Sequence, residues 1–228
     1  MKIDILTLFP EMFAPLKSSV IGRAIDGKKA ELVITDIRDY TLDKHKKCDD
    51  TPFGGGAGMV MTAQPIASAI ESVDPDHKAK RVYLSPKGRT FCQSVVKEYA
   101  ALDRLLLLCG HYEGVDQRAI DLYIDEELSV GDYVLTGGEI PAMAVTDAVL
   151  RYVDGVINGD SLLQESFTGD MLEYPQYTKP REFKGLTVPD VLLSGNHAEI
   201  DAWRRKKAEE ITAKNRPDLF EKSGRGGR

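Results

Sequence analysis

Short apolar segments alternate with longer amphipathic stretches through the first two thirds of the chain. Alternating or continuous apolar runs predict strands at 3–8, 31–37, 81–84, 104–109 and 128–135. Helical spacing between these runs predicts helices at 11–26, 64–73, 90–102, 116–123 and 141–153. Strands that alternate with helices are typical of an α/β domain with a mainly parallel sheet, which is the fold class that we expect.

The last part of the chain has a different pattern. Gly, Asp, Ser, Gln and Pro dominate residues 155–178, which predicts a linker. A strongly helical stretch follows at 196–214, with Asn196 as a candidate N-cap and Trp203 on its buried side. We therefore expect a domain boundary within 156–180.

Composition is ordinary for a folded protein, with 42% hydrophobic and 29% charged residues among 228. These values exclude long disorder, and no apolar run approaches the roughly 18 residues that span a bilayer. The first residues resemble a strand and turn rather than a signal peptide. The three cysteines, Cys48, Cys92 and Cys109, lack metal-ligand spacing, so we expect free thiols and a cytoplasmic protein. Because no apolar run is long enough to span a bilayer, we expect no membrane partner.

The net charge of −6 averages over two unlike parts of the chain. Residues 179–228 hold 12 Lys and Arg against 8 Asp and Glu, a net +4, which leaves −10 for residues 1–178. A basic C-terminal segment in an otherwise acidic chain is compatible with a polyanionic partner that binds at this segment. A solvated helical face explains the same charges equally well, so charge alone does not decide.

Three glycine-containing turns follow predicted strands, YLSPKG at 83–88, CGHYEG at 109–114 and SVGDYVLTGGEIP at 129–141. Ligands of open α/β sheets bind beyond the carboxyl ends of the strands, where glycine lets the backbone approach a ligand closely. One such turn is usually only a tight turn, but three in succession indicate one pocket. None has the GxGxxG or GxxxxGK[ST] pattern, which disfavours an ordinary dinucleotide fold and a P-loop.

Other candidate motifs give weaker signals. GGGAG at 54–58 lies in the irregular stretch 43–59, where a mobile loop is as good an interpretation as a substrate contact. Arg151, at the end of an apolar helix, is explained by the helix dipole alone. Because no serine lies in GxSxG and no histidine has ligand spacing, we expect neither a serine hydrolase nor a metal site.

Seven longer stretches follow one another along nearly the whole chain: LFPEMF (8–13), DDTPFGGGAGM (49–59), YLSPKG (83–88), CGHYEGVDQR (109–118), IDEELSVGDYVLTGGEIPAM (124–143), YPQYTKP (174–180) and VLLSGNHAEIDAWR (191–204). Together they closely resemble the bacterial tRNA (guanine-N1-)-methyltransferases, the tRNA methyltransferase D family of the SPOUT class. GDYVLTGGE and LLSGNHAEI are the most specific parts of this resemblance.

The resemblance implies a fold and an assembly. It implies an α/β domain of residues 1–157 whose C-terminal part is tied in a deep trefoil knot. A flexible linker of residues 158–178 and a small helical tRNA-binding domain of residues 179–228 would follow. It also implies a homodimer with active sites at the subunit interface.

The cofactor implied by the resemblance is S-adenosylmethionine, bent among the three glycine-containing turns. Backbone amides and carbonyls there can read the adenine edge, which explains why glycine is needed. By position, the residues around the cofactor are Tyr83, Leu84, Ser85, Pro86, Gly88, Gly110, Tyr112, Gly114, Ser129, Val130, Gly131, Asp132, Tyr133, Val134, Leu135, Gly137, Gly138 and Pro141.

The implied reaction moves a methyl group to N1 of the guanine at tRNA position 37, just 3′ of the anticodon. Because N1 carries a proton, a carboxylate base and a cation at O6 would promote transfer. By alignment the cation is Arg151, and the base is Glu165, where the family commonly has Asp. Asp170 and Glu173 are lesser base candidates. Glu113 is expected to face the methionine amino group or, alternatively, to bind magnesium, which this family is thought to need.

The resemblance further implies tRNA contacts in both domains, around a base splayed out of the anticodon loop. The expected contacts are Arg204, Arg205, Lys206 and Lys207, with Asn196 and His197, and Asp49 and Asp50 for the guanine at position 36. Two other functions stay open: methylation of another RNA site by the same fold, and RNA binding without catalysis.

Overall fold

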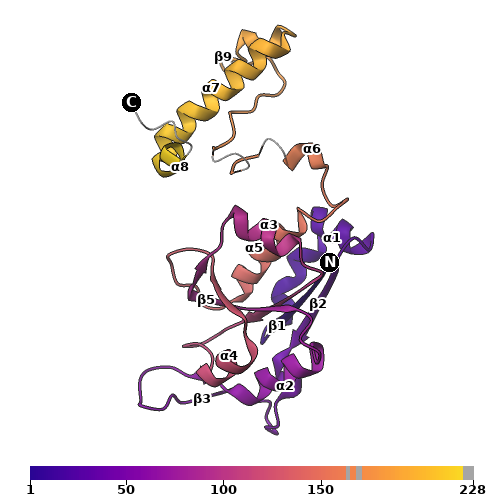
Figure 1. Ribbon diagram of the computed structural model, residues 1–228, viewed down its shortest axis with the longest axis vertical. Helices are drawn as coiled ribbons and strands as arrows, with labels where there is room; N and C mark the ends of the chain where they lie inside the picture. Colours follow the sequence, from indigo (N-terminus) through magenta and orange to yellow (C-terminus); the bar gives the residue numbers. More distant parts are fainter. Residues whose placement is uncertain (163–164, 168–170, 223–228) are drawn as a thin grey trace. The chain divides into compact units, whose positions relative to one another are not determined.

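The computed structural model describes residues 1–162, 165–167 and 171–222. Its internal contacts divide the chain into two units, Met1–Ile157 and Asn158–Arg228. The first unit is a sheet with helices on both faces, and the second is built around one long helix (Figure 1). The roles expected for residues 1–157, 158–178 and 179–228 stay predictions.

A five-stranded sheet forms the centre of the first unit. Its strands lie in the order β2-β1-β6-β5-β7, and every neighbouring pair is parallel, which confirms the predicted sheet. The central strand β6 is the continuous apolar run RLLLLC. A strand at this place needs apolar side chains on both sides, because helices cover both faces of the sheet. The strand bounds are Lys2–Thr7 for β1, Glu31–Asp36 for β2, Lys80–Thr90 for β5, Arg104–Cys109 for β6 and Glu126–Ser129 for β7.

Helices cover both faces of this sheet. One face packs against the 3-10 helix η1 and the helices α1, α3 and α5, which span Pro10–Lys17, Ser19–Asp26, Gln93–Ala100 and Glu139–Leu150. The other face packs against the 3-10 helix η2 and the helices α2 and α4, which span Ile37–Tyr40, Ala63–Val73 and Gln117–Tyr123.

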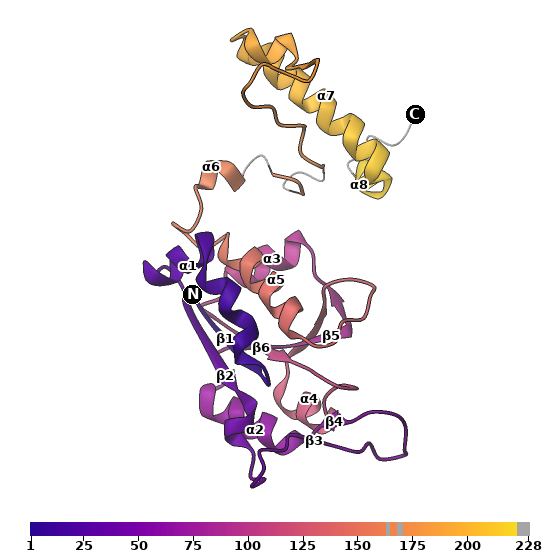
Figure 2. The same cartoon turned by 180° about the vertical axis from the view of Figure 1, so that it is seen from behind.

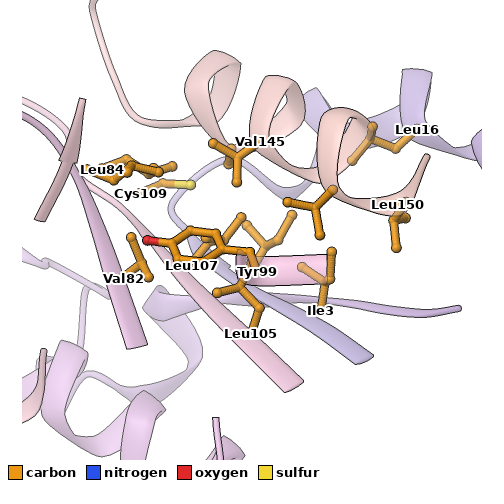
Figure 3. Close-up of a cluster of buried hydrophobic side chains, with 14 of the residues drawn as sticks. Ile3, Leu16, Val82, Leu84, Tyr99, Leu105, Leu107, Cys109, Val145 and Leu150 are labelled. Carbon is orange, nitrogen blue, oxygen red and sulfur yellow. The ribbon is translucent and has the colours of Figure 1, made fainter. Parts of the chain in front are cut away.

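The core between the sheet and α5 fixes the strand ends from which the site is built. Figure 3 shows Tyr99 among Val82 and Leu107 of the sheet, with Val145 of α5 on the helical side. All four side chains are fully buried. The Tyr99 hydroxyl donates a hydrogen bond to Glu126 at 3.1 Å, which anchors the start of β7 to this core.

A small hairpin is attached to the segment after β6. Its strands β3 (Asp49–Asp50) and β4 (Val60–Met61) pair antiparallel, and the loop between them projects away from the sheet (Figure 2). The Met61 amide donates to the Gly114 carbonyl, and the Asp116 amide donates to the Met61 carbonyl, both at 2.9 Å. The stretch 43–59, which the sequence predicts to be an irregular loop, is a loop except for the two residues of β3.

The prediction of a single helix over 11–26 is wrong. The chain forms η1 and α1 instead, separated at Ser18, whose backbone is extended (φ −113°, ψ 168°). Pro15 inside η1 has no amide hydrogen, so it removes an α-helical hydrogen bond there. Gly22 permits the tight junction, because a Cβ at this position would lie 2.3 Å from the Lys17 carbonyl oxygen.

The turn predicted at 85–88 is only partly right. These residues continue β5, but the register against β7 shifts, so that Leu84 and Arg89 both pair with Leu128. The residues between them bulge out of the ladder, where a proline and a glycine are tolerated. The helix predicted from residue 90 begins later, at Gln93, because the strand runs on past the bulge.

The strand predicted at 128–135 is displaced. β7 covers only Glu126–Ser129, and a loop runs from there to Gly138. The Ser129 hydroxyl donates to the Gly131 carbonyl at 3.0 Å and accepts from the Gly131 amide at 3.3 Å. These local bonds turn the backbone out of the sheet, and Gly131 has a φ of +153°, which side-chain-bearing residues rarely adopt.

The long helix α7 (His197–Asn215) of the second unit confirms the helix predicted at 196–214. The Asn196 side chain accepts a hydrogen bond from the Glu199 amide at 3.4 Å, as predicted for an N-cap. Short elements surround α7: α6 (Gly159–Leu162), β8 (Glu182–Phe183), β9 (Leu186–Thr187), the 3-10 helix η3 (Asp190–Leu193) and α8 (Pro217–Lys222).

The segment before β8 packs along α7. The Leu172 amide donates a hydrogen bond to the Thr212 hydroxyl at 2.9 Å. The ring of Trp203, which the sequence predicts on the buried side of the helix, is partly buried and lies 6.2 Å from the Tyr177 ring. This part of the predicted linker therefore belongs to the second unit.

Candidate active site

A pocket lies beyond the carboxyl ends of three neighbouring strands, β6, β5 and β7. Its cavity volume is about 300 Å³, at the lower end of the range of small-molecule sites. The walls are 83–87 from β5, 110–115 after β6, and 127–131 and 133–138 from β7 and its loop, with Gln117, Ile120 and Pro141. The structure thus brings together the three turns that the sequence groups into one pocket.

Two of the walls are joined through their backbones. The Gly138 amide donates a hydrogen bond to the Gly110 carbonyl at 2.8 Å, and His111 and Gly137 form an antiparallel bridge. A Cβ on Gly138 would lie 2.7 Å from the Cα atom of Cys109. Glycine is needed here because the two backbones touch.

Tyr83 closes the bottom of the pocket. Its ring lies against Gly110, where a Cβ would come within 2.8 Å of the ring. Burial, with a smaller contribution from the Glu127 carboxylate, raises the pKa of the Tyr83 hydroxyl to about 12. This hydroxyl therefore stays protonated at neutral pH and acts as a packing and hydrogen-bonding group. Burial also raises the pKa of the neighbouring Cys109 thiol.

The charged side chains that line the pocket are Lys87, Glu113 and Glu127. Glu113 is held by its backbone, since its amide donates to the Met59 carbonyl at 2.9 Å. Its side chain lies against Gly58, where a Cβ would be 2.5 Å from the Glu113 Cγ atom. The glycine-rich loop therefore contacts a pocket residue directly. With two carboxylates and one ammonium group, the lining suits a ligand that carries positive charge.

Nearly all residues expected around the cofactor line this pocket; the exceptions are Gly88 and Asp132. Gly88 packs on the β7 backbone, where a Cβ would lie 2.3 Å from the Glu127 carbonyl carbon. Asp132 is exposed on the loop after β7. Three further lining residues belong to the predicted turns without an individual assignment, Lys87, His111 and Thr136. The sequence does not indicate the other five: Val115, Gln117, Ile120, Glu127 and Leu128.

The expected catalytic residues outside the pocket lie in different units. Arg151 is the C-cap of α5 in the first unit and is partly buried. Glu165 lies in the second unit, next to Ser166, whose hydroxyl accepts a hydrogen bond from the Glu173 amide at 3.0 Å. Both Arg151 and Glu165 make further interactions within the structure. Asp170 lies outside the described residues.

The basic cluster expected to contact RNA lies on α7. Arg205 and Lys206 are exposed, whereas Lys207 pairs with Glu210 at 2.6 Å. The Arg204 guanidinium lies 5.0 Å from the centre of the Tyr174 ring. His197 is the first residue of this helix and is exposed.

The two aspartates expected to read the neighbouring guanine form β3. Asp49 is partly buried, while Asp50 is exposed and lies 3.6 Å from the Lys47 ammonium group. A hydrogen bond from the Thr51 amide and the charge of Lys47 lower the pKa of the Asp50 carboxyl, so it is ionised at neutral pH.

The described residues contain no group of three His, Cys, Asp or Glu side chains that could hold a metal ion. No helix among them combines the length and the apolar character needed to cross a membrane.

Comparison with known proteins gives a consistent result. Residues 1–222 match the family model described as tRNA (Guanine-1)-methyltransferase TrmD. A tRNA (guanine-N(1)-)-methyltransferase of Clostridium botulinum strain Langeland is 54% identical over 223 residues, which cover 97% of this chain and 92% of the relative. A relative of the same name from Clostridium beijerinckii is 53% identical and covers 97% of this chain and 93% of its own length. The resemblance expected from the sequence is confirmed.

Proposed function

Because the chain belongs to the tRNA (Guanine-1)-methyltransferase TrmD family, we propose that it methylates N1 of a guanine in tRNA, at position 37, with S-adenosylmethionine as the methyl donor. The observation that carries this proposal is the glycine-lined pocket at the carboxyl edge of β5, β6 and β7, in a chain that matches the family over residues 1–222. The guanine at position 37 follows from the family resemblance.

The pocket fits the expected cofactor in three respects. Its walls are largely backbone, which can hydrogen-bond an adenine edge, and Gly110 and Gly138 leave room that a Cβ would fill. Its carboxylates, Glu113 and Glu127, complement a ligand with a sulfonium and an ammonium group. Its volume of about 300 Å³ admits a small folded ligand. S-Adenosylmethionine, when bound there, supplies an electrophilic methyl group.

The chain's own task is to manage the proton and the charge of guanine. N1 becomes a good nucleophile only as its proton leaves, so we assign the Glu165 carboxylate as the base that accepts it. Arg151 would hold the negative charge that develops at O6. Glu113, on the pocket wall, would orient the methionine amino group. Glu173 is the lesser base candidate among the described residues.

Magnesium has weaker support than S-adenosylmethionine. Magnesium sites in enzymes usually combine one or two carboxylates with substrate phosphates. Glu113 and Glu127 are the carboxylates on the pocket lining, and no preformed cluster of three ligands accompanies them within the described residues. We therefore assign no step of the reaction to a metal ion.

We further propose a homodimer whose active sites lie at the subunit interface. Tyr133, Val134 and Ile140, beside the pocket, are 57%, 83% and 50% exposed, and apolar exposure of this kind is typical of a contact surface. A trefoil knot is proposed from family membership alone. Free cysteines at all three positions support a cytoplasmic location.

In the proposed RNA complex, Arg204, Arg205 and Lys206 would contact phosphates. Asn196 and His197, at the start of α7, and Asp49 and Asp50, on β3, are the further contacts that the resemblance assigns. The exposure of Arg205 and Lys206 on α7 supports this arrangement.

The function is tested by methyl transfer from labelled S-adenosylmethionine to two tRNA transcripts, one with guanine and one with adenine at position 37. Digestion to nucleosides identifies the product. We expect 1-methylguanosine from the guanine transcript alone. Label in neither transcript, with tRNA still bound, would establish RNA binding without catalysis. Equal label in both would place the target elsewhere in the RNA.

A further inference from the structure

A buried polar atom without a partner lies on the pocket wall. The Nδ1 atom of His111 is inaccessible to solvent and makes no hydrogen bond. The polar atom facing it is a carboxylate oxygen of Glu139, in the first turn of α5, at 3.9 Å. This separation is too long for a hydrogen bond by roughly 1 Å. Buried polar groups are nearly always paired, so this gap needs a physical reason.

Glu139 is fixed in place and able to accept a further hydrogen bond. Its side chain is 2% exposed, and its other carboxylate oxygen accepts a hydrogen bond from the Thr7 hydroxyl at 2.8 Å. Thr7 is the last residue of β1. The carboxylate is therefore anchored to the sheet, while the oxygen that faces His111 remains available.

The His111 ring lies between two aromatic rings, and its Nδ1 atom is 3.9 Å from the Glu139 carboxylate. Phe9 lies 4.8 Å from the imidazole centre, and Tyr112 meets the imidazole edge-on at 5.0 Å. The Arg38 guanidinium is the charged group beyond Phe9, 5.1 Å from that ring, and it pairs with Asp36. In this orientation of the ring, the acceptor nearest to Nδ1 that the structure records is the Glu139 carboxylate.

Gly137 keeps the space between the two groups open. A Cβ on Gly137 would lie 2.3 Å from the Glu139 oxygen and 2.6 Å from His111 Nδ1. Any side chain at this position would separate the pair. His111 and Gly137 also form a backbone bridge, so the two walls are joined next to this gap.

We propose that His111 is a positioning residue for the cofactor. When S-adenosylmethionine fills the pocket, the Nδ1–H group donates a hydrogen bond to Glu139 and fastens the wall 110–115 to the first turn of α5. The ligand named here rests on the proposed function. The proposed hydrogen bond involves only His111 and Glu139, so its formation can be tested apart from methyl transfer.

Two substitutions at His111 separate hydrogen bonding from ring packing. His111→Phe keeps a ring against Phe9 and Tyr112 but has no donor. His111→Asn loses the ring but keeps an N–H donor near the position of Nδ1. We expect the Phe variant to bind S-adenosylmethionine about tenfold more weakly in calorimetry and the Asn variant to recover most of that loss. His77→Phe is the matched control, since His77 is an exposed histidine that pairs with Asp125 outside the pocket.

The outcomes are distinct. Binding that is unchanged in the Phe variant but lost in the Asn variant would overturn the proposal in favour of ring packing. Absence of S-adenosylmethionine binding by the wild-type chain would overturn the proposed function and this use of His111 with it. If the Phe variant does not fold, nitrogen NMR of the wild-type histidines decides. An Nδ1 resonance that does not change when S-adenosylmethionine is added would contradict the hydrogen bond.

Discussion

The two units of this chain differ in how their surfaces are built. In the first, the pocket walls are backbone segments held at strand ends by a core that includes Tyr99 and Leu107, both fully buried. In the second, the only buried side chains among the described residues are Ile200, Ala208 and Thr212. A rigid backbone suits a small ligand of fixed shape, whereas exposed side chains on a helix suit a large, charged RNA.

The comparison predicts that substitutions in the two units have separate effects. Changes to the pocket walls in the first unit should weaken cofactor binding. Methyl transfer should then fall only because less cofactor is bound. Changes to Glu165 or to the basic face of α7 in the second unit should leave cofactor binding intact and alter catalysis or tRNA affinity.

The largest effect is expected from Glu165→Gln. The amide cannot accept the N1 proton, so single-turnover methyl transfer should slow by about 10²- to 10⁴-fold. The affinity for S-adenosylmethionine, measured by calorimetry, should stay unchanged because the pocket walls belong to the first unit.

Glu165→Asp is the matched control, since it keeps a carboxylate and introduces the residue common in the family. It should retain activity. If Glu165→Gln transfers methyl groups within about threefold of the wild-type rate, a barrier change of only ~0.65 kcal/mol, Glu165 is not the base.

The next effect is expected from Gly138→Ala in the first unit. The Gly138 backbone is right-handed helical (φ −81°), so alanine is allowed there, but its Cβ would press on the Cys109 backbone at 2.7 Å. Separating the two walls should reduce S-adenosylmethionine affinity by about tenfold or more, as overpacking does in tight sites. Gly159→Ala, with nothing within 4 Å of the added Cβ, should bind as the wild type does. Equal affinities in calorimetry would show that the walls need no close contact.

A smaller effect, on stability alone, is expected from Thr212→Val. The Thr212 hydroxyl accepts from the Leu172 amide at 2.9 Å and donates to the Ala208 carbonyl at 2.6 Å. Valine leaves that amide unpaired, so the second unit should lose about 1–3 kcal/mol. Hydrogen exchange at Leu172 should accelerate, while cofactor affinity stays the same. Unchanged exchange would mean that the segment is held by other contacts, such as that of Tyr177 with Trp203.

The smallest effects are expected from Arg205→Ala and Lys206→Ala. Each removes one exposed positive charge from α7, so the slope of log affinity for tRNA against log salt should fall by about 1 per substitution. Lys28→Ala, an exposed lysine of the first unit, is the control for general charge. If both variants have the wild-type slope, Arg205 and Lys206 of α7 do not contact the RNA phosphates.

Much of the fold was predictable because the central strands are continuous apolar runs. RLLLLC is typical of a buried parallel strand and forms one, and Asn196 correctly marks the start of α7. The errors fall where the backbone leaves regular geometry for local reasons. Ser18 breaks a helical pattern, and the Ser129 hydroxyl turns the chain at Gly131 although apolar residues continue the strand pattern beyond it.

The site was predictable to the extent that glycine marks close backbone contact. Gly110 and Gly138 were grouped into one pocket from their places after strands, and they contact each other. The sequence places His111 in the pocket as part of the turn 109–114 but assigns it no role, and it misses Glu127, because neither spacing nor residue type distinguishes a pocket-lining charge from a solvated one. Gly88 was assigned to the cofactor, but it is also needed for packing on β7, which only the sheet register reveals.

The claim that the first unit alone lines the cofactor pocket is tested most directly by amide hydrogen exchange of the full chain with and without S-adenosylmethionine. We predict slower exchange on addition of the cofactor in 83–88, 110–114 and 129–138, and no change in α7 (His197–Asn215). Protection confined to α7, with those three segments unchanged, would contradict it.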